Sequence, residues 1–147
     1  LCRYYNRVHG YQARAIRIFS AYGSGLRKQL LWDMYQKYQN TGEIKLFGTG
    51  NETRDFIHVS DIMHAIALIL AYDGDEEVFN VANGEEVSIR ELAQIYEKIV
   101  TFAGETKVGD PQNWCADISL LKKIGYQKHK ELEAGVFDYV NWVKAEG

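Results

Sequence analysis

Strand-like segments alternate with amphipathic helical segments along this chain, and that alternation limits the fold more than any other feature. Strand patterns, with period-two alternation or β-branched and aromatic residues, occupy residues 14–19, 43–47 and 78–82. Apolar residues at three- and four-residue spacing, as on one face of a helix, occupy residues 26–38, 61–72, 88–99, 117–124 and 132–143. This order favours α/β packing over an all-α bundle.

The length of the chain fits one domain. Its 147 residues can bury roughly two-thirds of their unfolded surface. Three short strands make a small sheet with open edges that need partners. The chain opens at Leu1 rather than Met, inside a helix-like pattern, so we expect residues 1–147 to be a single portion of a longer protein. Either strands of the missing part complete the sheet, or two copies of the chain pair.

Composition and charge exclude several classes of protein. Hydrophobic residues make up 46% of the chain and there is a single Pro, as in ordinary globular proteins. The net charge of -3 argues against a basic surface for nucleic acid. Cys2 and Cys115 lack a CxxC partner, which indicates neither a zinc site nor a disulfide framework and favours a cytoplasmic setting. The longest apolar run, residues 62–72, is too short to cross a membrane.

A glycine-rich stretch at residues 48–53 follows a predicted strand and superficially resembles a phosphate-binding loop. Its third glycine position is Thr53, and no helix begins directly behind it. The helix N-terminus that would hold a pyrophosphate is therefore missing. We interpret the stretch as a turn.

Acidic residues and histidines recur every third position after this turn, as Asp55, His58, Asp61 and His64. A change from strand to helix near Ser60 would send these side chains in different directions, which argues against a metal site. We interpret the segment as a helix start with Ser60 or Asp61 as the N-cap. A metal-dependent hydrolase built on Asp55 and His58 is the weakest alternative, and no Ser-His-Asp arrangement supports nucleophilic catalysis.

Arg54 lies between the glycine turn and an apolar segment. A guanidinium there is either a surface charge or a positioned fork for phosphate or carboxylate groups. Composition alone does not decide between these two interpretations.

Five segments around Arg54 occur in a recognisable order. They are Arg17-Ile18-Phe19-Ser20-Ala21-Tyr22-Gly23, Leu46-Phe47-Gly48-Thr49-Gly50, Arg54-Asp55-Phe56-Ile57-His58-Val59 with Asp61, Phe79-Asn80-Val81, and Gly109-Asp110 with Ala116-Asp117. Together they resemble the C-terminal part of the extended short-chain dehydrogenase/reductases, specifically the NAD-dependent nucleotide-sugar epimerase/dehydratase family. The resemblance covers nearly the whole chain. It implies the C-terminal substrate-binding part of an extended Rossmann-type enzyme, which grips a nucleoside-diphosphate sugar beside an NAD(P)-binding domain.

The catalytic parts of that family are not found in the chain. The family's Tyr-x-x-x-Lys pair precedes the segment that matches residues 1–10, and Tyr4 and Tyr5 are followed at the fourth position by Val8 and His9. The glycine-rich cofactor loop is also missing. The resemblance therefore implies a fragment that is inactive alone, whose absent N-terminal Rossmann part binds NAD or NADP in a homodimeric protein.

The resemblance also assigns roles to individual residues. Arg54 matches the arginine that binds the substrate diphosphate, and Asp110 matches a carboxylate near the ribose. Phe47 matches an aromatic position on the nucleotide base, and Leu30 lies where a helix lines the base pocket. Phe19 matches a position beside the nicotinamide. The alternatives are plain core packing for the three apolar residues and turn capping for Asp110.

Three positions depart from the family pattern. Ser20 replaces an Asn that hydrogen-bonds the substrate in many relatives, and its hydroxyl reaches less far. Lys107 corresponds to a basic residue that often precedes the Gly-Asp pair, and Ser24 stands where Pro is common. These departures leave the sugar and the subfamily open.

The function that the resemblance implies is substrate binding for an NAD-dependent sugar-nucleotide epimerase or dehydratase. A non-catalytic binding or assembly module that kept the fold is the alternative from a different class. We also expect an exposed apolar surface, and self-association through it, because Ile16, Ile18 and Phe19 would otherwise be core.

Overall fold

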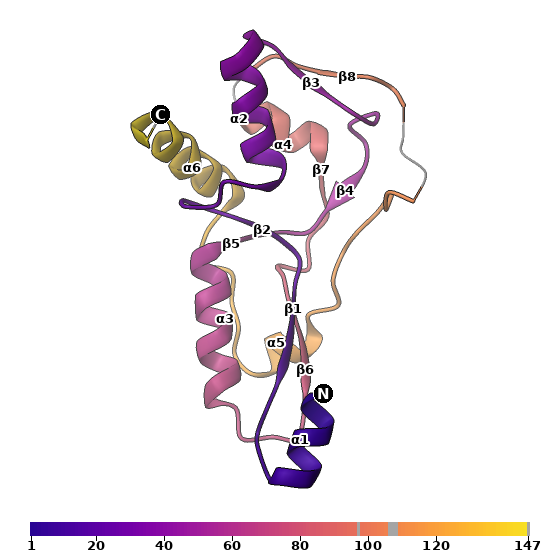
Figure 1. Cartoon of the computed structure of the whole chain (residues 1–147), viewed down its shortest axis with the longest axis vertical. Helices are drawn as coiled ribbons and strands as arrows, with labels where there is room; N and C mark the ends of the chain where they lie inside the picture. The colour runs from indigo at the N-terminus through magenta and orange to yellow at the C-terminus, as the bar shows by residue number, and fades with distance from the viewer. Residues whose placement is uncertain (97, 106–108, 147) are drawn as a thin grey trace.

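The computed structural model describes residues 1–96, 98–105 and 109–146 of the chain. Short strands alternate with helices in these ranges, which confirms the predicted α/β class (Figure 1). In chain order the elements are α1 (Cys2–His9), β1 (Ala15–Ile18), β2 (Ser20–Tyr22), α2 (Gln29–Thr41), β3 (Ile44–Leu46), β4 (Thr53–Arg54), β5 (Phe56–His58), α3 (Val59–Ala71), β6 (Val78–Val81), β7 (Val87–Ser88), α4 (Ile89–Ile95), β8 (Val100–Phe102), α5 (Ser119–Lys123) and α6 (Leu132–Glu146).

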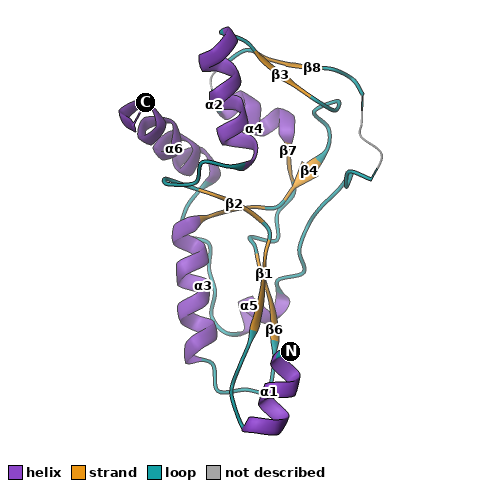
Figure 2. Ribbon diagram, viewed as in Figure 1, coloured by secondary structure: helices purple, strands orange, loops and turns teal. Residues whose placement is uncertain are grey.

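The strands pair two by two instead of forming one wide sheet. Three pairs are parallel, β1 with β6, β2 with β5 and β3 with β8, and β4 pairs antiparallel with β7. Figure 2 shows the pairs distributed along the long axis of the molecule, from β1 and β6 near α1 to β3 and β8 beside α2. Each pair joins segments that are distant in sequence.

Two hydrophobic cores flank the pair β2–β5. One contains Met34, Leu92 and Tyr139 from α2, α4 and α6, and the other contains Phe79 and Leu121 from β6 and α5. Successive residues of a strand point to opposite sides, so within β5 one side chain enters each core. Figure 1 accordingly shows α2, α4 and α6 toward one end of the molecule and α3, α5 and α1 toward the other.

Local signals in the sequence account for several helix ends. Ser88 and Glu91 form a capping box, because Ser88 Oγ accepts the Glu91 N–H at 3.1 Å and Glu91 Oε2 accepts the Ser88 N–H at 2.7 Å. Gly42 ends α2 with a φ of 72°, in the left-handed conformation that glycine adopts readily.

The predicted cap of α3 is wrong. The helix begins at Val59, and His58 caps it by accepting the Ser60 N–H at Nδ1, at 3.2 Å. Asp61 cannot serve as the cap because its carboxylate accepts the backbone N–H groups of His129 and Lys130 instead, at 3.3 and 3.2 Å. An imidazole nitrogen thus does what we expected of a hydroxyl or carboxylate.

The prediction of a helix through residue 99 is also wrong. α4 ends at Ile95, and Ile99, which we expected on the buried face, is 87% exposed. Three β-branched residues, Ile99, Val100 and Thr101, favour extended backbone, and β8 begins at Val100.

An apolar surface is exposed along β1, as predicted from Ile16 and Ile18, and along α1 as well, whereas Phe19 is partly buried. α1 has no buried residue, and Leu1, Tyr4 and Val8 are 96%, 60% and 55% exposed. Ile16 and Ile18 of β1 are 38% and 45% exposed. Among the described residues, no helix is both long and apolar enough to span a bilayer.

Candidate functional site

A cavity of about 330 Å³ opens where α2, β3, β4 and the segment after β8 meet. The residues that line it are Ser20, Gln29, Leu30, Asp33, Lys37, Leu46, Phe47, Gly48, Glu52, Arg54, Phe56, Ile89, Asp110 and Gln112. Five of the residues predicted for the site are among them: Ser20, Leu30, Phe47, Arg54 and Asp110. The fold therefore brings together side chains that lie up to ninety positions apart in the sequence.

Backbone carbonyls and an aromatic ring position Arg54. β4 pairs with β7, which places Arg54 opposite Val87. Arg54 Nη1 donates to the carbonyl oxygens of Thr53 and Pro111 at 2.7 and 2.9 Å, and the guanidinium lies 5.8 Å from the ring centre of Trp114. Within the described ranges, no acceptor bonds its Nε or Nη2. Those donors could bind an anion in the cavity.

The two apolar residues predicted for the base pocket differ in burial. Phe47 directly follows β3 and is 63% exposed, so it is not a core residue. Leu30 is partly buried and packs against the core formed by α2, α4 and α6. One exposed ring and one partly buried aliphatic side chain thus give the cavity an apolar wall.

Asp110 is exposed and lies on a segment that is tied to β4. Its neighbour Pro111 accepts the bond from Arg54, and the Gln112 carbonyl accepts the Thr53 N–H at 2.9 Å. In the part of the chain that the structure describes, the Asp110 side chain caps no turn.

Ser20 is partly buried and held in β2, where its N–H donates to the Asp55 carbonyl at 3.0 Å.

Phe19, the residue predicted beside the nicotinamide, does not line this cavity. Phe19 is partly buried, and its ring lies edge-on to Trp114 with centroids 5.8 Å apart. Lys107 lies outside the described residues.

The glycine-rich turn after β3 is filled by a side chain of the protein itself. The Glu52 carboxylate, 8% exposed, accepts the N–H groups of Thr49 and Gly50, both at 2.9 Å, and the Thr49 hydroxyl at 3.2 Å. Burial raises the pKa of Glu52, but these hydrogen bonds outweigh it and hold the pKa below its usual value. The stretch is a turn, as predicted, and its amides do not form a pocket for a cofactor pyrophosphate.

Sequence reasoning missed several residues that line the cavity. Asp33 and Lys37 lie one and two turns after Leu30 on the same face of α2, so their spacing from Leu30 was the available signal. Glu52 and Gln112 had no such signal, because their positions depend on how the turn and the segment after β8 fold back on β4.

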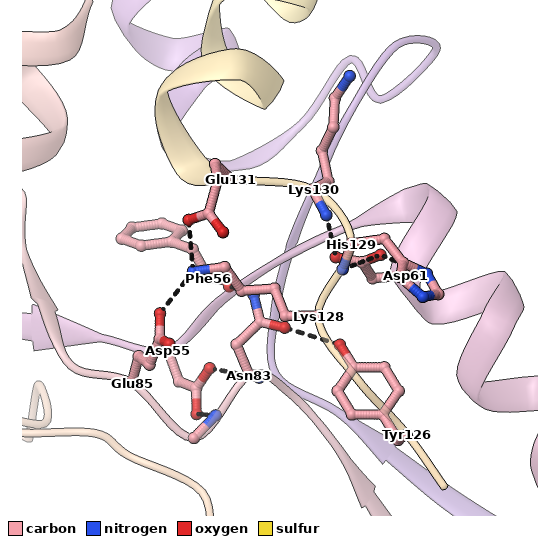
Figure 3. Close-up of polar contacts among 11 residues, drawn as sticks. Asp55, Phe56, Asp61, Asn83, Glu85, Tyr126, Lys128, His129, Lys130 and Glu131 are labelled. Carbon is pink, nitrogen blue, oxygen red and sulfur yellow. Dashed lines mark hydrogen bonds and ion pairs between the residues drawn. The ribbon is translucent and has the colours of Figure 1, made fainter.

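Asp55 and Asp61, the two acidic residues of the recurring Asp and His pattern, hold backbone segments together (Figure 3). Asp55 is fully buried and accepts the N–H groups of Asn83 and Gly84 at 2.9 Å and of Ala116 at 3.1 Å. Burial raises the pKa of Asp55 despite these bonds. Figure 3 also shows the Tyr126 hydroxyl donating to Asn83, at 2.7 Å. Among the described residues, no three His, Cys, Asp or Glu side chains are placed to hold a metal ion.

The chain belongs to the NAD dependent epimerase/dehydratase family, whose model matches residues 1–82. It is 29% identical over 150 residues to a putative UDP-glucose 4-epimerase of Methanocaldococcus jannaschii, covering 95% of this chain and 48% of that protein. It is 33% identical over 112 residues to GDP-L-fucose synthase 1 of Arabidopsis thaliana, covering 72% of this chain and 34% of that protein. The chain thus spans about half the length of these relatives, or less.

The chain is also similar in structure to solved nucleotide-sugar epimerases. The chain superposes on the UDP-N-acetylglucosamine 4-epimerase of Methanobrevibacter ruminantium M1 with a TM-score of 0.85 and 25% identity, over 99% of this chain and 50% of that one. The UDP-glucuronic acid 4-epimerase of Bacillus cereus shares the fold, with a TM-score of 0.85, 22% identity and coverage of 99% and 49%. The match lies in the C-terminal portion of these epimerases, as the sequence resemblance implied.

Proposed function

We propose that this chain is the substrate-binding portion of an NAD-dependent nucleotide-sugar epimerase or dehydratase, and that a nucleoside-diphosphate sugar binds in the cavity beside Arg54. One observation carries the proposal. Five side chains that the sequence singled out for this role, on five separate segments of the chain, line a single cavity. A chance grouping would leave some of them on other faces of the molecule.

The proposed roles follow from the chemistry of each group. Arg54 binds the diphosphate, because two carbonyls and a ring hold one side of its guanidinium while Nε and Nη2 remain available to phosphate oxygens. Phe47 and Leu30 pack on the base, Asp110 accepts from the ribose hydroxyls, and the Ser20 hydroxyl contacts the sugar. Lys107 would contribute a positive charge to substrate binding, and Phe19 would pack beside the nicotinamide of the cofactor.

The cofactor of the proposed enzyme is NAD or NADP, which would supply hydride transfer to and from the sugar when bound. The turn that most resembles a dinucleotide loop in this chain is occupied by Glu52, so we propose that the cofactor is bound mainly by a Rossmann part outside these residues. This chain would contribute orientation, since binding energy from a remote nucleotide handle aligns the reacting carbon. The chain alone would then be inactive.

We further propose that the complete protein is cytoplasmic and homodimeric.

The relatives include proteins named for UDP and for GDP sugars. The names of the relatives therefore do not fix the base of the nucleotide.

Calorimetric titration with nucleoside diphosphates tests the proposal. Arg54→Ala should weaken binding of every nucleoside diphosphate by tenfold or more, because a charge-assisted bidentate contact contributes about 1.5–3 kcal/mol. Arg7→Ala, which removes an exposed arginine from α1, is the matched control and should bind like the wild type. An unchanged dissociation constant for Arg54→Ala would refute the assignment.

A further inference from the structure

One face of α2 carries a pair of opposite charges into the cavity. Asp33 and Lys37 both line it, together with Leu30 one turn earlier. Lys37 Nζ donates to Asp33 Oδ2 in an ion pair four residues apart, with side chains 34% and 50% exposed. In the described part of the chain nothing bonds the other carboxylate oxygen, Oδ1. Neither residue has a role in the proposed contacts with the diphosphate, ribose or sugar.

We propose that Asp33 and Lys37 read the edge of the nucleotide base and that the base they select is guanine. The ligand of the cavity would then be a guanosine-diphosphate sugar. This inference rests on the proposed function and adds the identity of the base to it.

The edge of guanine matches this pair group by group. Guanine presents two neighbouring donors, the N1–H and the exocyclic N2 amino group, followed by the O6 acceptor. A carboxylate accepts from both donors at once, and an ammonium beside it donates to the oxygen. Asp33 and Lys37 offer those two groups side by side on α2.

The other bases would leave a carboxylate facing an acceptor. Uracil and thymine flank their single N3–H with carbonyl oxygens, adenine has the N1 acceptor beside its amino group, and cytosine has N3 beside its own. Each would set a lone pair against an oxygen of Asp33, and such a mismatch inside a site is costly. The pair would therefore reject these bases as well as favour guanine.

The other two acidic residues that line the cavity, Glu52 and Asp110, have different roles. The Glu52 carboxylate is occupied by the N–H groups of Thr49 and Gly50. Asp110 precedes Pro111, whose carbonyl holds Arg54, so it lies beside the proposed diphosphate site. Asp33 instead shares its helix face with Leu30, part of the apolar wall on which the base would stack.

Dissociation constants for GDP, UDP, dTDP and ADP, measured by calorimetry on the wild type and on Asp33→Asn, test the inference. We expect GDP to bind the wild type at least tenfold more tightly than the other three. Asp33→Asn should weaken GDP by about tenfold and change UDP by less than twofold, since the amide cannot accept from two donors. Glu43→Gln makes the same charge change at an exposed site just after α2 and should leave all four constants unchanged.

The outcomes separate the two proposals. Equal affinity of the wild type for GDP and UDP, or an Asp33→Asn variant that weakens all four ligands alike, would overturn the selection of guanine. The proposed function would stand in that case, provided that Arg54→Ala still weakens each ligand. If none of the four nucleoside diphosphates binds, both the selection of guanine and the proposed function are overturned.

Discussion

Asp55 is buried and follows the cavity residue Arg54 directly in the sequence. Its carboxylate binds backbone N–H groups of two other segments and does not line the cavity. It accepts N–H groups from the turn after β6 and from the segment before α5. These bonds fix the residue between β4 and β5 that separates Arg54 from Phe56, and both of those neighbours line the cavity. A residue outside the cavity thus holds the backbone that presents Arg54.

Replacing Asp55 tests this role. Asp55→Asn should lower the free energy of unfolding by about 2 kcal/mol, because the amide has one acceptor oxygen for three N–H donors and turns its own NH2 toward them. Urea denaturation measures the change, with Asp73→Asn in the exposed loop after α3 as the control. A variant as stable as the control would mean that the three bonds contribute little.

Glu52 makes the stability of the turn depend on pH. Its pKa in the folded protein is below the usual 4.5, since the Thr49 and Gly50 amides favour the charged form more than burial disfavours it. The stabilisation is therefore complete above about pH 4.5 and is lost as the pH falls through the lower, folded-state pKa. Unfolding free energies of the wild type and Glu52→Gln should differ at pH 7 and converge toward pH 3.

Glu76→Gln is the control for this comparison, because Glu76 is exposed in the loop before β6. Its difference from the wild type should stay small across the same pH range. A Glu52→Gln difference that is constant with pH would show that the carboxylate charge does not stabilise the turn.

At the scale of elements, the start of α4 is linked to the candidate site through a strand. Ser88 pairs with Thr53 and Val87 with Arg54 in the ladder between β7 and β4. The same Ser88 caps α4. A single residue therefore connects the position of a helix with the strand that carries Arg54.

Removing this cap should have a defined effect on stability. Ser88→Ala should lower the free energy of unfolding by about 1 kcal/mol, since it leaves the Glu91 N–H without its acceptor. Ser88→Asp should retain most of the stability because aspartate also caps helices well. Thermal and urea unfolding measure both variants, with the exposed Ser24→Ala as the control, and equal stability of Ser88→Ala and the control would contradict the role.

The elements that sequence reasoning located share one property, which is that neighbouring residues determine them. The end of α2 at Gly42 and the capping box at Ser88 are local, and a glycine after a helical stretch or a serine three residues before a glutamate is visible in the sequence. The short strands β4, β7 and β8 were missed because two or three residues form a strand only when a distant partner is present. The cap at His58 was missed because the alternative, Asp61, is occupied by residues nearly seventy positions away.

The residues of the candidate site also fall into those that the sequence identifies and those that only the fold brings together. Arg54 and Phe47 could be named because they lie in segments that resemble the family, and the structure places both at the cavity. Asp33 and Lys37 look from the sequence like an ordinary surface ion pair at helical spacing. Only the folding of β3 and the segment around Asp110 against α2 makes them part of a cavity.

The whole molecule places the cavity and the exposed apolar surface in different regions. The cavity lies where α2, β3 and β4 meet, while α1 lies at the opposite end and β1 runs from the middle of the molecule toward it (Figure 1). Contiguous exposed apolar surface on a soluble protein usually marks a binding face. The two regions can therefore be altered independently by mutation.

The exposed apolar surface of α1 and β1 should drive self-association of the chain. The chain should bind a hydrophobic dye and associate at high concentration, because Tyr4, Val8 and Ile18 are all largely exposed. Val8→Glu combined with Ile18→Glu should weaken association about tenfold or more in sedimentation experiments. Leu70→Glu, a control at a 76% exposed position of α3, should associate like the wild type. A wild-type chain that stays monomeric and binds no dye would show that the α1 and β1 surface does not drive association.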